Sequence, residues 1–190
     1  MEYGSLPDIS YDAYITSETV NEQIRSEKVA ETGVLGDGGV RVTHYWIYSP
    51  GYGSLKWEEF YKEGIMAISR EELGDLREYG SRSDMREAFM EARDDGRSYK
   101  MASLETWQFV HEIQPGDVIF AKYGTDAVIG KGIVESDYIY DPNRSDGYVN
   151  IRKVRWTNNG LRPHPGKAIT KILTDVTAYT GYVGKLNALY

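Results

Sequence analysis

Residues 117–140, DVIFAKYGTDAVIGKGIVESDYIY, are the stretch that decides the fold. The run DVIFAKYG alternates apolar side chains in the manner of a β-strand. The run DAVIGKGIVESDYIY continues as a strand pair or as one bent strand, because Gly130 and Gly132 permit a bulge or a sharp curve. A further alternating run, YVNIRKVRW at residues 148–156, ends at the tight turn NNG. The sequence therefore predicts a strongly curved sheet here.

The preceding part of the chain mixes strands with helices. The run VTHYWIYSPG predicts a buried strand that ends at Pro50, and SLKWEEFYKEG predicts a short helix ended by Gly64. After a second strand, IMAIS, we expect a helix capped by Ser83 and another, SLETWQFVHEI, that stops at Pro115. A brief strand and a terminal helix close the chain. Short strands broken by helices predict an α+β domain, built on a curved mixed sheet or small barrel that helices flank.

Two segments divide the chain. Residues 1–43 are predicted to form an N-terminal extension, and residues 44–190 the main domain. In the extension we expect a short extended piece and a helix over residues 11–30. The Gly-rich run GVLGDGG at residues 33–39 then predicts a flexible turn.

Composition limits the class of protein. The chain of 190 residues has no Cys, which excludes disulfides, thiolate metal sites and thiol nucleophiles. No apolar run is long enough to cross a bilayer, so no membrane partner is expected, and a cytoplasmic location is the simplest reading.

The charge is unevenly distributed. The net charge of −7 argues against nucleic acid, yet residues 121–171 carry nine basic and five acidic side chains, a local balance of +4. These cations are either a basic face or scattered strand-surface charges. The candidates for contact with a phosphate backbone are Lys122, Lys131, Arg144, Arg152 and Lys153.

No pattern in the sequence indicates catalysis. The three His, at 44, 111 and 164, do not form HExxH or another metal-ligand spacing. Neither GxxxxGK[ST] nor GxSxG occurs. The sequence thus predicts a protein that is not an enzyme, with no catalytic residues, no metal and no cofactor.

Aromatic rings are the more informative feature, with 16 Tyr, 4 Trp and 4 Phe. Four of them (Trp46, Trp107, Phe109 and Trp156) lie in apolar periodic runs and are assigned to the core. Others lie near predicted strand ends and loops, where a flat ring can stack on a base: Tyr48, Tyr52, Trp57, Tyr138, Tyr140 and Tyr148.

Over residues 45–190 the chain resembles a known family. The motifs GDL, WQF, PGD, GKGIV and YIY, in this order, are similar to those of EVE-type domains of the PUA-like superfold. The form that it resembles stands at the N-terminus of McrB-type subunits of modification-dependent restriction systems. The resemblance implies a barrel-like curved sheet and kinship with YTH domains, which bind N6-methyladenine in an aromatic cage. It also implies a DNA partner with a modified, flipped base, and in the full-length protein a GTPase motor and a nuclease subunit.

The resemblance further implies a base-binding pocket with three walls. The first wall follows the first strand, the second lies at residues 66–70, and the third follows the GIV strand. The implied base-binding residues are Tyr48, Ser49, Pro50, Gly51, Trp57, Met66, Ile68, Arg70, Asp137, Tyr138 and Tyr140. The family commonly has Trp where this chain has Arg70, which could stack on a base, bind phosphate or pair with a carboxylate. An RNA-binding module, or a protein-interaction domain without a nucleic acid ligand, are the alternative functions.

Overall fold

The computed structural model describes residues 32–34 and 40–190. Its main element is a seven-stranded sheet in the order β4-β8-β6-β5-β3-β9, with β7 paired to β8. Only β3 and β5 are parallel, so the sheet is mixed. The strands are β3 (Tyr45–Tyr48), β4 (Ile65–Ile68), β5 (Val118–Tyr123), β6 (Ala127–Val134), β7 (Ile139–Tyr140), β8 (Asn150–Pro163) and β9 (Leu173–Asp175).

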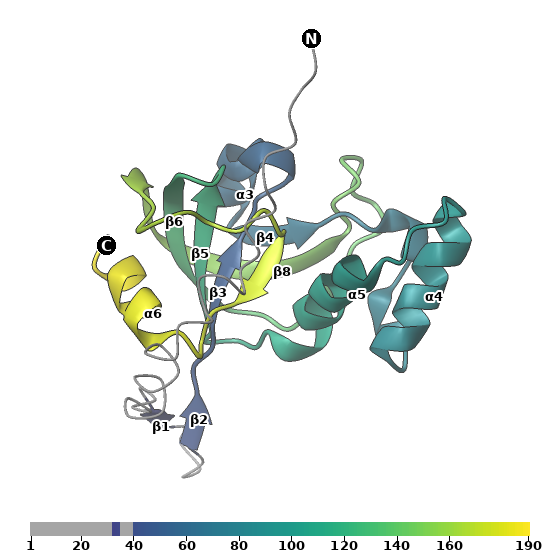
Figure 1. Ribbon diagram of the computed structural model, residues 1–190, viewed down its shortest axis with the longest axis horizontal. Helices are drawn as coiled ribbons and strands as arrows, with labels where there is room; N and C mark the ends of the chain where they lie inside the picture. The colour runs from purple at the N-terminus through teal and green to yellow at the C-terminus, as the bar shows by residue number, and fades with distance from the viewer. Residues whose placement is uncertain (1–31, 35–39) are drawn as a thin grey trace.

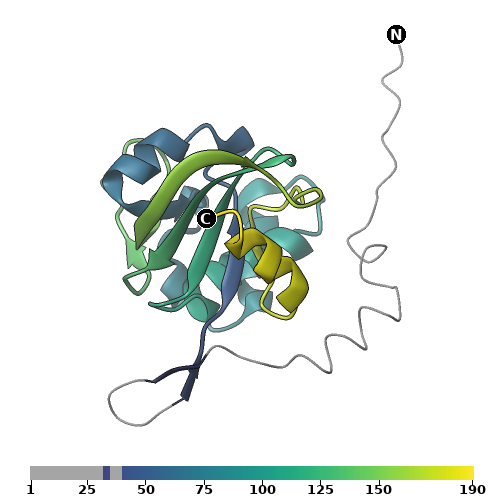
Figure 2. The same cartoon turned by 90° about the vertical axis from the view of Figure 1, so that its left-hand side faces the viewer.

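Helices cover the sheet from several sides. Figure 1 shows α4 and α5 together on one side of the sheet and α6 on the opposite side, which faces the viewer in Figure 2. The predicted α+β class, with a curved mixed sheet flanked by helices, is confirmed. The helices are α3 (Trp57–Glu63), α4 (Arg82–Arg93), α5 (Lys100–Trp107) with the π turn η4 (Gln108–Glu112), and α6 (Thr180–Asn187); the 3-10 turns are η1 (Tyr52–Ser54), η2 (Glu71–Leu73) and η3 (Leu76–Glu78).

The middle of the sheet is buried on both faces. Trp46, Tyr48 and Ile119 belong to the larger core, which also receives side chains of α3, α4 and α5. Ile47 and Phe120 point to the other face and pack in a smaller core with side chains of α6. A strand covered on both faces needs apolar residues at every position, which is why β5 begins with four of them in succession.

Glycines give the sheet its curvature, as the sequence predicted. The register between β6 and β8 shifts beside Gly130 and again beside Gly132. A Cβ atom on Gly130 would lie 2.1 Å from Cη2 of Trp57, and one on Gly132 would lie 2.6 Å from Cε3 of Trp156. Glycine is required here because both indole rings pack directly onto the backbone of β6.

Tyr48 connects two strands that are not neighbours in the sheet. Its hydroxyl donates to the carbonyl of Ala67 in β4 at 2.6 Å and accepts from the Ala67 amide at 3.0 Å. The ring is completely buried, and burial raises the pKa of its hydroxyl. Because β3 and β4 are far apart in the strand order, this contact holds the sheet curled and brings the ends of both strands together.

Several sequence-based boundaries need correction. Helix α4 begins at Arg82 with Ser81 as its N-cap, not Ser83, since the Ser81 hydroxyl accepts from the Asp84 amide. The helix expected over residues 11–30 lies outside the described residues. At the expected glycine-rich turn, β1 (Thr32–Val34) pairs with β2 (Val40–Val42).

Candidate functional site

Three loops meet at the end of the curled sheet where β3 and β4 finish. We call this place the junction site and define it by residues 49–51 after β3, 69–70 after β4 and 147–148 before β8. The Tyr48–Ala67 contact joins the first two loops. The third is close as well, because a Cβ on Gly51 would lie 2.9 Å from the Tyr148 hydroxyl. Two of the three predicted walls therefore lie side by side.

Asn150 ties the third predicted wall to the second. Its amide nitrogen donates to the Ser69 carbonyl at 2.9 Å, and its Oδ1 accepts from the Tyr138 hydroxyl at 2.7 Å. The same hydroxyl accepts from the Leu76 amide at 3.1 Å. Asn150 is completely buried, so these bonds are shielded from water and fix the loop after β4 against β7 and β8.

Arg70 is the most unusual residue of the junction site. Its backbone is left-handed, with φ 99° and ψ 31°, a conformation that is costly for a residue with a Cβ. Its guanidinium carbon lies 5.4 Å from the Phe89 ring centroid, and Nε donates to Thr106 Oγ1 at 3.4 Å. No carboxylate among the described residues lies within ion-pair distance of it. Burial lowers the pKa of Arg70, against the opposing effects of Glu105 and Glu72.

Two buried ionisable groups, Lys122 and Glu105, act on each other, and Glu105 also acts on Arg70; we call these two residues the floor of the site. Lys122, 3% exposed, donates from Nζ to the Ile169 carbonyl, and Glu105, 8% exposed, accepts from the Ile172 amide at 3.2 Å. Burial lowers the pKa of Lys122 to about 8 and raises the pKa of Glu105. The Ile172 carbonyl accepts from the Ser49 amide at 2.8 Å, which connects this floor to the first wall. Three cations, Arg70, Lys171 and Lys122, thus act on one carboxylate, and perturbed groups of this kind concentrate at functional sites.

Tyr148 is a ring at this site that the sequence analysis noted at a loop but did not include among the base-binding residues. It is half-buried, its centroid lies 5.2 Å from that of Phe60, and the Lys56 ammonium lies 5.4 Å from it. Tyr140 on β7 is also half-buried. The curl of the sheet, which the sequence does not display, brings Tyr148 next to Gly51.

Other predicted site residues lie in the core instead. Tyr48 and Met66 are completely buried, Trp57 is 2% exposed and Ile68 is 4% exposed. Trp57 packs on Gly130 and on Trp156, so its ring is used to shape the sheet. These side chains support the site from behind and have no free face for stacking. A position near a strand end does not reveal that these side chains are buried, because their burial depends on how the sheet curls.

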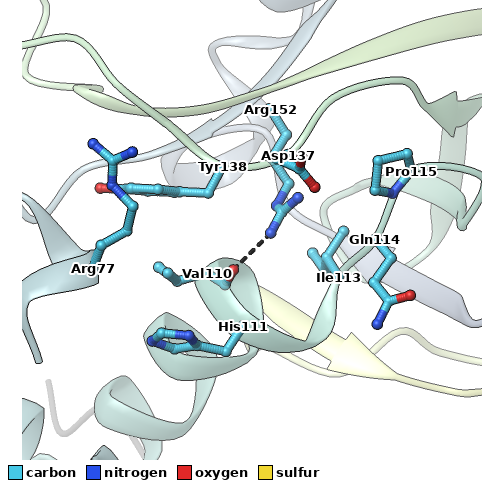
Figure 3. Close-up of a pocket in the computed structure, with 9 residues that line it drawn as sticks. All are labelled: Arg77, Val110, His111, Ile113, Gln114, Pro115, Asp137, Tyr138 and Arg152. Carbon is cyan, nitrogen blue, oxygen red and sulfur yellow. Dashed lines mark hydrogen bonds between the residues drawn. The ribbon is translucent and has the colours of Figure 1, made fainter. Parts of the chain in front are cut away.

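Tyr138 and Asp137 border a separate hollow of about 650 Å³, shown in Figure 3. Its lining residues are Arg77, Val110, His111, Ile113, Gln114, Pro115, Asp137, Tyr138 and Arg152. The Arg77 guanidinium lies 5.6 Å from the Tyr138 ring centroid. Tyr138 thus bonds through its hydroxyl to Asn150 and Leu76 and borders the hollow with a part of its ring, although only 7% of the residue is exposed.

Arg152 on β8 is hydrogen-bonded to the π turn η4 that follows α5. Its guanidinium donates to the carbonyls of Phe109 at 2.7 Å, Val110 at 2.8 Å and Ser136 at 3.1 Å. It is 2% exposed, and burial lowers its pKa to about 10. Its partners are backbone atoms, so in this conformation Arg152 is not available to a phosphate outside.

The other predicted backbone contacts are only partly accessible. Lys122 is buried in the floor described above. Arg144 forms ion pairs with Asp146 at 2.8 Å and Glu63 at 2.6 Å, which raise its pKa. Lys131 is half-buried, and Lys153 is exposed. Of the five cations predicted to contact a phosphate backbone, only Lys153 is exposed. A count of charges does not show whether a strand residue points inward or outward, so the sequence could not predict this burial.

Among residues 32–34 and 40–190, no group of three or more His, Asp or Glu side chains is placed to hold a metal ion. In the same residues, no helix has the length and apolar character needed to cross a membrane.

Solved structures show weak overall similarity to this chain. The YTH domain-containing protein mmi1, in an RNA complex, is 10% identical, with 82% of this chain and 88% of that chain covered at a TM-score of 0.39. Rpa0253 from Rhodopseudomonas palustris is 12% identical, with 77% and 94% covered at 0.40. The YTH domain of Zygosaccharomyces rouxii MRB1, in complex with N6-methyladenosine RNA, is 11% identical, with 76% and 86% covered at 0.40.

Among curated proteins, none matches the chain. A family model described as a domain of unknown function, DUF8426, matches residues 46–180. The matched region runs from β3 to the first residue of α6 and includes all three loops of the junction site. The chain therefore belongs to the DUF8426 family.

Proposed function

We propose that this chain is a non-catalytic reader that binds a flipped, modified base of DNA at the junction site, as the specificity domain of a modification-dependent restriction system. The observation that carries the proposal is Arg70. A left-handed arginine without an ion-pair partner, half-buried between three loops, is strained and incompletely compensated. Such an arrangement is maintained where a ligand uses it.

The geometry around Arg70 suits a flat ligand. Phe89 lies against the guanidinium, and a base that stacks on the opposite face would continue the same stack. Tyr140 and Tyr148 supply half-buried rings nearby, while Ser49, whose hydroxyl donates to the Gly51 carbonyl at 3.0 Å, supplies a polar group at the base of the loops. Planar stacking partners with a few fixed polar groups are typical of sites that hold an extruded base.

The charges around Glu105 are compatible with an anionic ligand. Arg70, Lys122 and Lys171 all act on the one carboxylate of Glu105, and Glu72 also acts on Arg70. A cation in a low-dielectric environment attracts phosphate strongly over a short range. The resemblance to the EVE-type domains of restriction subunits favours DNA, and an RNA ligand is the alternative that the same chemistry allows.

Fluorescence anisotropy tests the proposal. The panel holds DNA single strands and duplexes, and RNA of the same sequence, each with adenine, N6-methyladenine, cytosine or 5-methylcytosine at one position. We expect one modified DNA to bind tightest, and Arg70→Ala to weaken that binding about tenfold, which is about 1.4 kcal/mol. Arg97→Ala, an exposed arginine outside the junction site, is the matched control.

Each result has a clear reading. Preference for RNA over DNA of the same sequence would support the alternative function, an RNA-binding module. Equal weak affinity for every oligonucleotide, or equal effects of the Arg70 and Arg97 substitutions, would refute the assignment.

A further inference from the structure

The loop between β3 and α3 exposes two large apolar side chains beside the junction site. Tyr52 is 92% exposed and Leu55 is 82% exposed, the highest values among the large hydrophobic residues that the structure describes. The other large exposed apolar residues range from 42% to 57%. We call residues 50–56 the η1 loop. Exposing apolar surface costs free energy, so a pair this exposed in one short loop calls for a partner.

The η1 loop is held rigid despite its exposure. Ser54, 2% exposed, donates from its hydroxyl to the Lys122 carbonyl at 2.7 Å, and the Lys56 amide donates to the Pro50 carbonyl at 3.0 Å. Ser54 has a φ of 66°, an unfavourable value for a residue with a Cβ, beside Gly53 at 59°. Buried hydrogen bonds thus hold a strained turn that turns Tyr52 and Leu55 outward.

The position of the loop identifies its partner. The η1 loop begins at Pro50 and Gly51, which are also the first wall of the junction site. A base that leaves a duplex to enter that site leaves a gap in the stack, and apolar or aromatic side chains can fill such a gap. Resting on the proposed function, we propose that Tyr52 and Leu55 form a wedge that enters a nucleic acid duplex beside the extruded base.

The surroundings favour a duplex over a membrane or a broad protein interface. Lys56, the cation of the loop, is engaged by Glu59 at 2.7 Å and Asp146 at 3.5 Å, and the neighbouring Glu58 is exposed. With its cation engaged, the loop offers no free charge to a membrane surface or to phosphate, so apolar insertion is the contact that it can make. The apolar surface is confined to two side chains, with Gly53 and Ser54 between them in the sequence, which is too small for a broad protein interface.

The experiment compares the parent with the double variant Tyr52→Ala/Leu55→Ala on two probes. One probe is a DNA duplex with a single N6-methyladenine, and the other is the methylated strand alone. The wedge predicts that the double variant binds the duplex about tenfold more weakly, since each stacked ring contributes about 1–3 kcal/mol, and that it binds the single strand like the parent. The loss should be the same at low and high salt, because it removes no charge.

Two controls accompany the comparison. Leu161→Ala removes an exposed leucine of β8 and should leave duplex binding unchanged. The conservative variant Tyr52→Phe/Leu55→Met should retain duplex binding. All variants should have the parent's unfolding midpoint, since the replaced side chains are exposed.

The outcomes separate the wedge from the proposed function. Unchanged duplex binding, or equal losses on duplex and single strand, would overturn the wedge and leave base recognition standing. Cosedimentation of the parent, but not the double variant, with anionic phospholipid vesicles would assign the loop to a membrane and also overturn it. A parent that binds neither probe would overturn the proposed function and the wedge together.

Discussion

Tyr48→Phe tests whether the hydrogen bonds between Tyr48 and Ala67 hold the first two loops of the junction site together. It removes one hydroxyl and leaves the ring, which is completely buried, in place. In the parent that hydroxyl satisfies both the carbonyl and the amide of Ala67. Because burial raises its pKa, the phenol stays protonated and keeps both roles over the ordinary pH range.

The expected loss follows from these two bonds. A buried backbone group left without a partner costs about 1–3 kcal/mol, so two such groups give about 2–6 kcal/mol of unfolding free energy. With a urea dependence of about 2 kcal/mol per molar, the unfolding midpoint should fall by about 1–3 M.

Urea unfolding followed by tryptophan fluorescence measures this difference. Tyr52→Phe is the matched control, since its hydroxyl is on a ring that is 92% exposed, and its midpoint should equal that of the parent. If the Tyr48 and Tyr52 variants unfold at the same urea concentration, Tyr48 does not hold β3 against β4. The explanation of why the two walls meet would then be wrong.

Two further predictions concern the floor and the curvature of the sheet. Lys122 has a folded-state pKa of about 8 against an ordinary value of 10.5, so between these pH values the unfolded chain binds more protons than the folded chain. The free energy of unfolding of the parent should therefore rise relative to that of Lys122→Met as the pH increases from about 8 to about 10. A difference in unfolding midpoint that stays constant with pH would contradict this. Gly130→Ala should lower the unfolding temperature by several degrees, because its Cβ would lie 2.1 Å from Trp57. Gly184→Ala on α6 is the control: its Cβ meets open space, so the substitution should be neutral or stabilising. Equal unfolding temperatures for the two variants would refute the packing argument.

Local pattern was sufficient to predict most of the fold. Alternation identified the strands around Val118 and Ile151, and Gly64 ended α3 in a left-handed cap as expected. The bulges beside Gly130 and Gly132 were also predictable, because glycine within a strand favours them. The indole rings that require those glycines come from distant parts of the chain, and no local pattern indicates them.

The candidate site was predictable only in outline. The loops after β3 and β4 were expected near each other, whereas residues 147–148 were not placed at the site, and the direction of each side chain depends on how the sheet curls. Tyr48 and Trp57 turn inward for this reason, while Tyr148 reaches the site. The buried ionisable pair, Glu105 and Lys122, had no sequence signal, because a glutamate in a helix and a lysine in a strand are ordinarily on the surface.

An NMR titration of the isotope-labelled protein, with a DNA duplex that carries one N6-methyladenine, tests the central claim most directly. Binding at the junction site predicts the largest amide shifts at residues 49–51, 69–72 and 146–148, and Arg70→Ala, by weakening binding about tenfold, should move the same shifts to higher DNA concentration. Shifts concentrated at residues 110–115, around the hollow of Figure 3, or no shifts at all, would contradict the claim that this site binds a modified base of DNA.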